Sequence, residues 1–392
     1  MDKERLYRIA LIVLTILQIS LAAFYLNTLS RIDNWSAVYA EDSKGYLLVA
    51  DFYMGRELSA QDIPLMKYRL FSPVIPFAAS ILGKFIGVPA AFLCINFILW
   101  NLTALILYEL LKILIKGNYA AFVGAAIFTT SLPLIEWGLP IMVDMGAYFF
   151  ACLIPYLYLK LFHPQEGERV QSGFPSSGSI RGERALQIEG DIYKNILLGL
   201  CLGLAILTKP LLITALFFVL LSLLYTKRYR SALMLFSLPV LLVAAVYWLL
   251  GLSAGDFTAF SAPRHRGVIY LLTAAFFCFH WGWFFFWRGW KTAEENKQFY
   301  ILYIITFISP FVFFVHNPRL FFLAYPSVIP LIASGMNTKY TKAVRIGTAS
   351  PLLLAGYIIT SNALAVFHLY VMRHLKIRDW EGLVDFFSKL IS

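Results

Sequence analysis

Asp42, Tyr46 and Ala50 follow the first hydrophobic segment of the chain, in its first acidic cluster. Residues four apart in a helix share one face, so the spacing predicts that Asp42 and Tyr46 lie side by side. A carboxylate at the mouth of a bundle of apolar helices is suited to act as a general base. The alternative is structural. Asp is a favoured N-cap, and Asp42 could cap a short surface helix whose first turn is residues 43–46.

Several other charged residues stand at the ends of apolar segments or in the turns between them. They are Arg69, Glu136, Asp144, Lys209, Arg264, Arg266, His316 and Arg319. On the topology inferred below, all of them fall on the extracytoplasmic side together with Asp42. Charges gathered at one face of an apolar bundle indicate a site for an anionic, membrane-borne ligand.

These charged residues also have structural interpretations. Lys209 can snorkel to the membrane interface and end a helix beside Pro210. Arg264 can be a solvated loop charge, and His316 can cap a neighbouring helix. Asp144 is harder to explain in this way, because a carboxylate within an apolar helix is costly unless it is paired.

The composition indicates a membrane protein. Of the 392 residues, 60% are hydrophobic and 14% are charged, and the mean hydropathy is +0.72, whereas a soluble protein is about one quarter charged. The net charge of +11 arises from short basic clusters between apolar runs, as the positive-inside rule produces, and does not indicate nucleic acid binding. The four cysteines lie inside apolar runs and predict neither a disulfide nor a metal cluster.

The apolar runs predict an all-α, polytopic bundle of about eleven spans, forming one integral-membrane domain over residues 1–392. We expect the N-terminus in the cytoplasm and the C-terminus outside. Residues 30–72 form an extracytoplasmic loop with interfacial helices, and residues 163–191 read as a flexible cytoplasmic linker. The apolar stretch 73–87 is short, and whether it crosses the membrane stays open. Later runs include 192–225, broken at 208–210, and a span at 268–287.

The order of these features resembles the GT-C superfamily of integral-membrane glycosyltransferases, which use polyprenyl-phosphate sugar donors. The likeness is greatest to protein O-mannosyltransferases and lipid A aminoarabinose transferases, over roughly residues 5–335. The matching motifs are Asp42-x3-Tyr46-x3-Ala50, Arg69-x3-Pro73-x2-Pro76, the Thr208-Lys209-Pro210 break and Arg319 in an Arg-aromatic-Pro helix ending at Pro326. The sequence departs from these families at Ser43, where a second acidic residue is common, and at Val143, where Thr is usual.

The resemblance implies a plasma-membrane enzyme that transfers a sugar from a polyprenyl phosphate to an acceptor lipid, glycan or protein, with inversion. Asp42 would be the base, and Arg69, Lys209 and Arg319 would bind the donor phosphate. Tyr46, Asp144, His316 and Arg264 would support the site. Some relatives use a divalent metal ion, for which Asp42 and Asp144 would be the candidate ligands. Some members carry a large soluble C-terminal domain that this sequence lacks, so a protein acceptor is less expected.

Two other classes of function remain open at this point. Broken helices and intramembrane charges are also typical of transporters, here a transporter or flippase for lipid-linked sugars or another anion. A noncatalytic assembly subunit would share the same sequence features. The charges that we single out lie at one predicted surface rather than at the midplane, which favours the glycosyltransferase.

Overall fold

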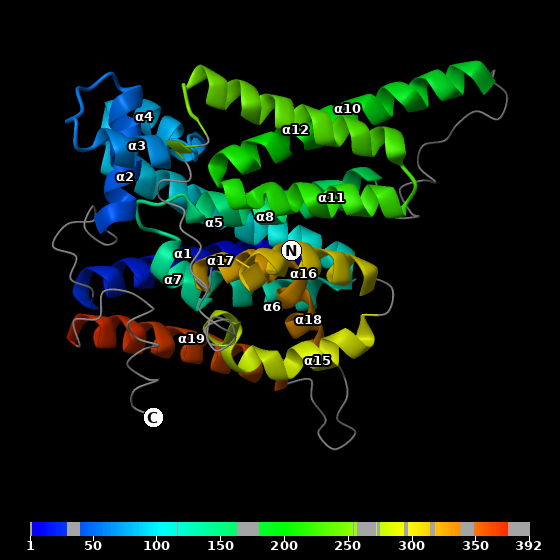
Figure 1. The fold of residues 1–392 in the computed structure, drawn as a ribbon. Helices are drawn as coiled ribbons and strands as arrows, with labels where there is room; N and C mark the ends of the chain where they lie inside the picture. The colour runs from blue at the N-terminus through cyan, green and yellow to red at the C-terminus, as the bar shows by residue number, and fades with distance from the viewer. Residues whose placement is uncertain are drawn as a thin grey trace.

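The computed structural model describes residues 2–29, 40–115, 117–162, 180–253, 255–256, 272, 275–293, 297–313, 318–337 and 349–374. Within these ranges every regular element is a helix (Figure 1). The helices that lead to the site are α1 Lys3–Leu29, α2 Ala40–Tyr53, α3 Ile63–Arg69, α4 Val74–Ile86, α5 Val88–Ile115, α6 Asn118–Thr129, α7 Leu132–Trp137 and α8 Asp144–Phe162. The later ones are α10 Ile180–Thr208, η2 Pro210–Leu212, α11 Ile213–Tyr225, α12 Tyr229–Leu249, η3 His280–Gly282, α15 Trp283–Thr292, α16 Lys297–Phe313, α17 Pro318–Phe321, η5 Phe322–Ala324, α18 Tyr325–Asn337 and α19 Ala349–His374.

The long apolar helices confirm the prediction of an all-α, multi-pass membrane bundle. In the described part of the chain, six helical segments are long and apolar enough to cross a membrane, or up to seven if the bent pair α3 and α4 counts as one span. Four shorter apolar helices accompany them. A span needs about 20 residues to cover the hydrocarbon core. The number of eleven spans therefore stays a prediction.

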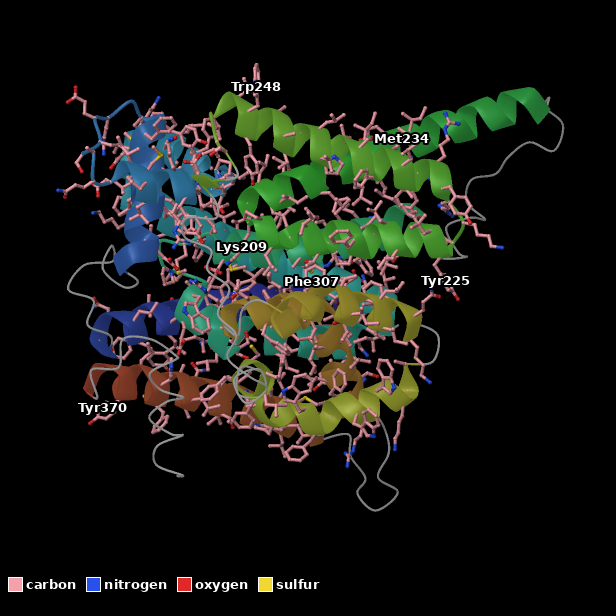
Figure 2. The ribbon with its side chains drawn as sticks, in the orientation of Figure 1. Lys209, Tyr225, Met234, Trp248, Phe307 and Tyr370 are labelled. Carbon is pink, nitrogen blue, oxygen red and sulfur yellow. The ribbon has the colours of Figure 1, made fainter. Side chains whose placement is uncertain are left out.

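The long helices run side by side, and α2, α3 and α4 gather at one end of them (Figure 1). Tyr370 of α19 lies toward the same end, whereas Tyr225, the last residue of α11, lies at the opposite end (Figure 2). Helix α4 has 13 residues and is about 20 Å long at 1.5 Å per residue, too short to cross alone. It is bent by 111° from α3.

Three hydrophobic clusters hold the described elements, and one of them, with Leu48, Val49, Met66 and Leu70, joins α2 to α3. The large one joins the long helices, with fully buried Trp100, Tyr148 and Tyr325 among its members. A smaller one lies under α2 and α4 and contains Tyr46, Ile75 and Phe92, together with Ile141 and Val143 from the segment before α8. This small core therefore packs α2 against that segment.

Two sequence predictions need correction here. The flexible linker does not reach residue 191, because residues 180–191 already belong to α10, and the rest of the predicted linker lies outside the described residues. The helix extends beyond its apolar part because this stretch contains the helix-forming residues Arg, Ala, Leu, Gln and Glu. Its charged and polar residues make the composition resemble that of a linker. The predicted span 268–287 is interrupted, since η3 separates helical residues 275–279 from α15, and His280 has a positive φ of 33°.

Candidate functional site

Asp42 lies inside α2, in the turn that opens the described part of the helix. Helix α2 begins at Ala40, so Asp42 is not the N-cap of a helix that starts at residue 43, and the capping interpretation is wrong. Tyr46 follows one turn later on the same helix and is buried, while Ala50 is fully buried beneath it. The predicted shared face is therefore real, and its lower part anchors α2 in the small core.

The carboxylate of Asp42 bridges two arginines from distant parts of the chain. Its Oδ1 accepts a hydrogen bond from Nη2 of Arg69, the last residue of α3 at the bend before α4. Its Oδ2 accepts a hydrogen bond from Nη1 of Arg319 at 2.9 Å. The three side chains are 18–21% exposed. A ligand can therefore contact the cluster from the protein surface, although most of the surface of the cluster is buried.

A second ion pair lies beside the first. Asp144, the first residue of α8, pairs through Oδ1 with Nζ of Lys209, and its Oδ2 is 3.9 Å from Nη1 of Arg319. The side chain of Asp144 is only 1% exposed and that of Lys209 is 15% exposed. Lys209 stands in extended conformation between α10 and η2, because Pro210 cannot continue the α10 hydrogen bonds. Figure 2 shows Lys209 within the bundle, below the ribbons of α10 and α12.

A glycine, Gly146, allows α8 to approach α10 and α4 closely. Gly146, half a turn after Asp144, has no room for a Cβ, which would lie 2.9 Å from Thr208 Cγ2 and 2.9 Å from Ile75 Cδ1. This close contact brings the start of α8 against the end of α10, and thereby Asp144 against Lys209. Tyr148 donates its hydroxyl to the backbone carbonyl of Arg319 at 2.8 Å and fixes α17 over the same helix.

Tyr46 and Tyr68 sit against the guanidinium of Arg69. Its Cζ lies 5.2 Å from the ring centroid of Tyr46 and 4.8 Å from that of Tyr68. Such cation–π contacts, together with the bond to Asp42, hold the arginine in one orientation. Burial raises the pKa of the Tyr46 hydroxyl to about 12, so this group stays protonated at neutral pH.

The electrostatics of Asp42 favour its charged form. Burial by itself would raise the pKa of this carboxyl, but Arg319 and Arg69 outweigh that effect and hold the pKa below its usual value of 3.8. Asp42 is therefore ionised at neutral pH. With the cations Arg69, Lys209 and Arg319 and the carboxylates Asp42 and Asp144, the cluster has a formal charge of +1, which suits an anionic ligand.

The two carboxylates do not fit a divalent metal ion in this arrangement. Asp42 is engaged by two arginines and Asp144 by a lysine, so a metal ion would have to enter among three positive charges. Among the described residues, no group of three or more His, Cys, Asp or Glu side chains is placed to hold a metal ion. The donor set is that of an anion site.

The structure thus brings together Asp42, Tyr46, Arg69, Asp144, Lys209 and Arg319. His316 and Arg264, the other predicted members, lie outside the described residues. Glu136 has a different partner: it is buried and pairs with Nδ1 of His368 on α19. The sequence analysis did not single out Gly146 or Tyr148, whose importance depends on contacts with segments far away in the chain.

Comparisons with known proteins extend these observations. No protein-family model matches the sequence, and the curated proteins contain no matching sequence. The structure is similar to the crystal structure of ArnT from Cupriavidus metallidurans bound to undecaprenyl phosphate, with a TM-score of 0.55 and 12% identity over 91% of this chain and 75% of that chain.

The fold is also similar to that of the oligosaccharyltransferase from Archaeoglobus fulgidus. Its apo form gives a TM-score of 0.54 with 14% identity, over 91% of this chain and 56% of that chain. The complex with zinc and sulfate gives 0.51 with 15% identity, over 90% and 53%. This chain therefore spans little more than half the length of the oligosaccharyltransferase. At these identities the likeness concerns the fold alone, and it confirms the expected GT-C-like helical architecture, which this protein shares with ArnT and with the oligosaccharyltransferase.

Proposed function

We propose that this protein transfers a glycosyl group from a polyprenyl-phosphate donor to an extracytoplasmic acceptor, with inversion at the anomeric carbon. The observation that carries the proposal is the bridge of Asp42 between Arg69 and Arg319, next to the pair of Asp144 and Lys209. It combines an ionised carboxylate with a surplus of cations. Inverting glycosyl transfer from a phosphate needs both a base and a phosphate site.

The charge balance supports a donor with a single phosphate. A phosphodiester between polyprenol and sugar carries one negative charge, which neutralises the formal +1 of the five-residue cluster. Arg319 and Lys209 would each donate to the phosphate oxygens, and charge-assisted bonds of this kind contribute about 1.5–3 kcal/mol each. The apolar faces of the surrounding helices would accept the polyprenyl chain in the membrane.

Binding of the donor would also release the base. In the free protein both oxygens of Asp42 accept hydrogen bonds from arginines. When a phosphate oxygen takes over Nη1 of Arg319, Oδ2 of Asp42 becomes available for the acceptor. The resting ion pair therefore keeps the carboxylate ionised and oriented until the donor arrives.

The transfer then proceeds in one displacement. The acceptor oxygen or nitrogen attacks the anomeric carbon from the face opposite the phosphate while the bond between that carbon and the phosphate oxygen breaks. The acceptor proton passes to Oδ2 of Asp42, and the electron pair of the broken bond leaves with the polyprenyl phosphate. Arg319, Lys209 and Arg69 would stabilise the charge that develops on this leaving group.

A reconstitution assay tests the proposal. Purified protein in liposomes is incubated with a panel of polyprenyl-phosphate sugars and an extract of candidate acceptors, and the released polyprenyl phosphate is quantified. We expect release in the wild type and its loss in Asp42→Asn. Movement of the intact lipid-linked sugar across the bilayer without any release would instead show a flippase and would refute the transferase.

A further inference from the structure

The segment between α7 and α8 is irregular, yet it is buried within the protein. Leu139, Ile141, Met142 and Val143 are 0–6% exposed, and residues 138–143 lie outside any helix. Non-helical backbone in a membrane protein is stable only where other groups satisfy its polar atoms. This segment leads directly into Asp144, so its conformation sets the position of that carboxylate.

Asn96 of α5 supplies the polar group that this segment needs. Its side chain is fully buried, and Nδ2 donates a hydrogen bond to the carbonyl of Pro140 at 2.7 Å. The carbonyls of Leu139 and Met142 both lie 3.4 Å from the same nitrogen. The Pro140 carbonyl also accepts a bond from the backbone N–H of Met142 at 2.7 Å. One amide group thus stands at the centre of the turn.

The side chains of the turn that Asn96 holds contact both the small core and Arg319. Ile141 and Val143 enter the small core beneath Tyr46 of α2. Met142, between them, is not part of that core, and its Sδ lies 3.9 Å from Nη1 of Arg319. The same Nη1 donates to Asp42. A change in the turn would therefore move a contact of Arg319, an arginine of the proposed phosphate site.

We infer that Asn96 is a positioning residue of the candidate active site, which acts through residues 139–143 on Asp144 and Arg319. This inference rests on the proposed function for its kinetic consequence but not for its structural one. Asn101, one and a half turns later on α5, shows that an Asn in this helix need not have such a role. Its Nδ2 donates to the carbonyl of Phe97 in its own helix at 2.9 Å.

The structural test compares Asn96→Leu with Asn101→Leu, both of which replace an amide by an apolar group of similar size. The background carries Met142→Cys as a probe and keeps the buried Cys152 of α8 as an internal reference, with the other native cysteines replaced. Purified protein is labelled with N-ethylmaleimide, and modification of the two cysteines is followed by mass spectrometry. We expect at least tenfold faster labelling at position 142 in Asn96→Leu and no change in Asn101→Leu.

The reference cysteine separates local from general effects. Equal labelling at position 142 in both Leu variants would overturn the inference, and so would a parallel rise at Cys152, which would show general loosening. If Asn96→Leu does not fold, Asn96→Ala takes its place. No substrate is used, so the test decides the role of Asn96 in holding the turn even if the proposed transferase function fails.

A kinetic measurement tests the link to the phosphate site. In the lipid-phosphate release assay, Asn96→Leu should raise the KM for the donor about tenfold and leave the KM for the acceptor unchanged, since the displaced contacts belong to Arg319 and Asp144. Faster labelling at position 142 with an unchanged donor KM would refute the positioning role. Absence of release by the wild type would refute the proposed function alone.

Discussion

Gly45 of α2 lies so close to Arg69 that a Cβ at position 45 would be 2.5 Å from Cγ of the arginine. Carbon atoms in contact are normally about 3.5–4.0 Å apart. The missing side chain therefore lets Arg69 cross α2 and reach Asp42, which stands three residues before the glycine. The glycine that leaves room for Arg69 and the carboxylate that Arg69 binds therefore lie in the same turn of α2.

Gly45→Ala should reduce glycosyl transfer, although Ala favours a helix more than Gly does. An added methyl group pushes Arg69 away from Asp42, and misplacement of a site group by about 1 Å can cost on the order of 100-fold in rate. Ala instead of Gly in a helix contributes about 0.8–1 kcal/mol to stability. The clash with Arg69 opposes this gain, so turnover should fall without a matching rise in stability. Turnover and thermal unfolding are measured on the same preparation. Gly356→Ala on α19 is the control, because its nearest neighbour would be 3.8 Å away. Normal turnover in Gly45→Ala would contradict the idea that Arg69 needs the space at position 45 to reach Asp42.

Asp42→Asn should abolish most of the turnover and preserve binding of the donor. The amide keeps the size of the side chain but cannot accept the acceptor proton, and loss of a general base typically costs a factor of about 10²–10⁴. Asp51→Asn is a matched control on the same helix, where the half-buried Asp51 pairs with the exposed Arg56. Transfer kinetics and undecaprenyl phosphate binding measure the two effects. Near-normal transfer by Asp42→Asn would exclude Asp42 as the general base.

The pH dependence of kcat/KM should respond to Arg69. Asp42 must be ionised to act as a base, so activity falls as the pH drops through its pKa, which Arg319 and Arg69 hold below 3.8 despite burial. Arg69→Met removes one of these cations while burial remains, and the acid limb should move to higher pH. Arg56→Met, whose guanidinium pairs with Asp51 instead, should leave the limb in place. An acid limb that does not move in Arg69→Met would show that another group limits the rate.

Lys209 and Asp144 should be coupled in stability. Lys209→Met leaves the 1% exposed carboxylate of Asp144 with only Arg319, 3.9 Å away, and breaking a buried pair costs up to about 3–5 kcal/mol. The double variant with Asp144→Asn should recover much of that loss, because the buried carboxylate that lost its lysine is then neutral. Donor affinity should stay weak in both, since Lys209, which we propose to bind the phosphate, is absent. Unfolding and donor titration are measured for the wild type, Lys209→Met, Asp144→Asn and the double variant, which together form a double-mutant cycle. Additive losses of stability would contradict the pairing.

The site should face the outside of the cell. Lys44 on α2 is 56% exposed, whereas Tyr225, at the opposite end of the bundle, is 68% exposed (Figure 2). In a background without native cysteines, Lys44→Cys should react with an impermeant maleimide in intact cells. Tyr225→Cys should react only after permeabilisation, because basic Lys227, Arg228 and Arg230 follow it. The reverse labelling pattern would invert the whole topology.

Local features of the sequence were sufficient to predict the parts of this protein that depend on near neighbours. Long apolar runs establish a multi-pass helical bundle, since only helices and closed barrels satisfy the backbone within lipid. Asp42 and Tyr46 share a helical face because four residues make about one turn. The break at Lys209 follows from Pro210, which lacks the N–H that a helix requires. Composition misled at residues 180–191, where helix-forming polar residues imitated a linker, and at residues 268–287, where a continuous apolar run hid the break at η3.

The pairing of the charges, by contrast, was decided by the tertiary structure. Arg319 is 277 residues from Asp42, and no local pattern shows which of several cations reaches which carboxylate. Asn96 and Asn101 are indistinguishable as polar residues in one apolar helix, yet one holds the turn before Asp144 and the other bonds to its own helix. The physical reason is that helix packing fixes which faces meet. Ion pairs and buried hydrogen bonds form only between groups that this packing brings within about 3 Å.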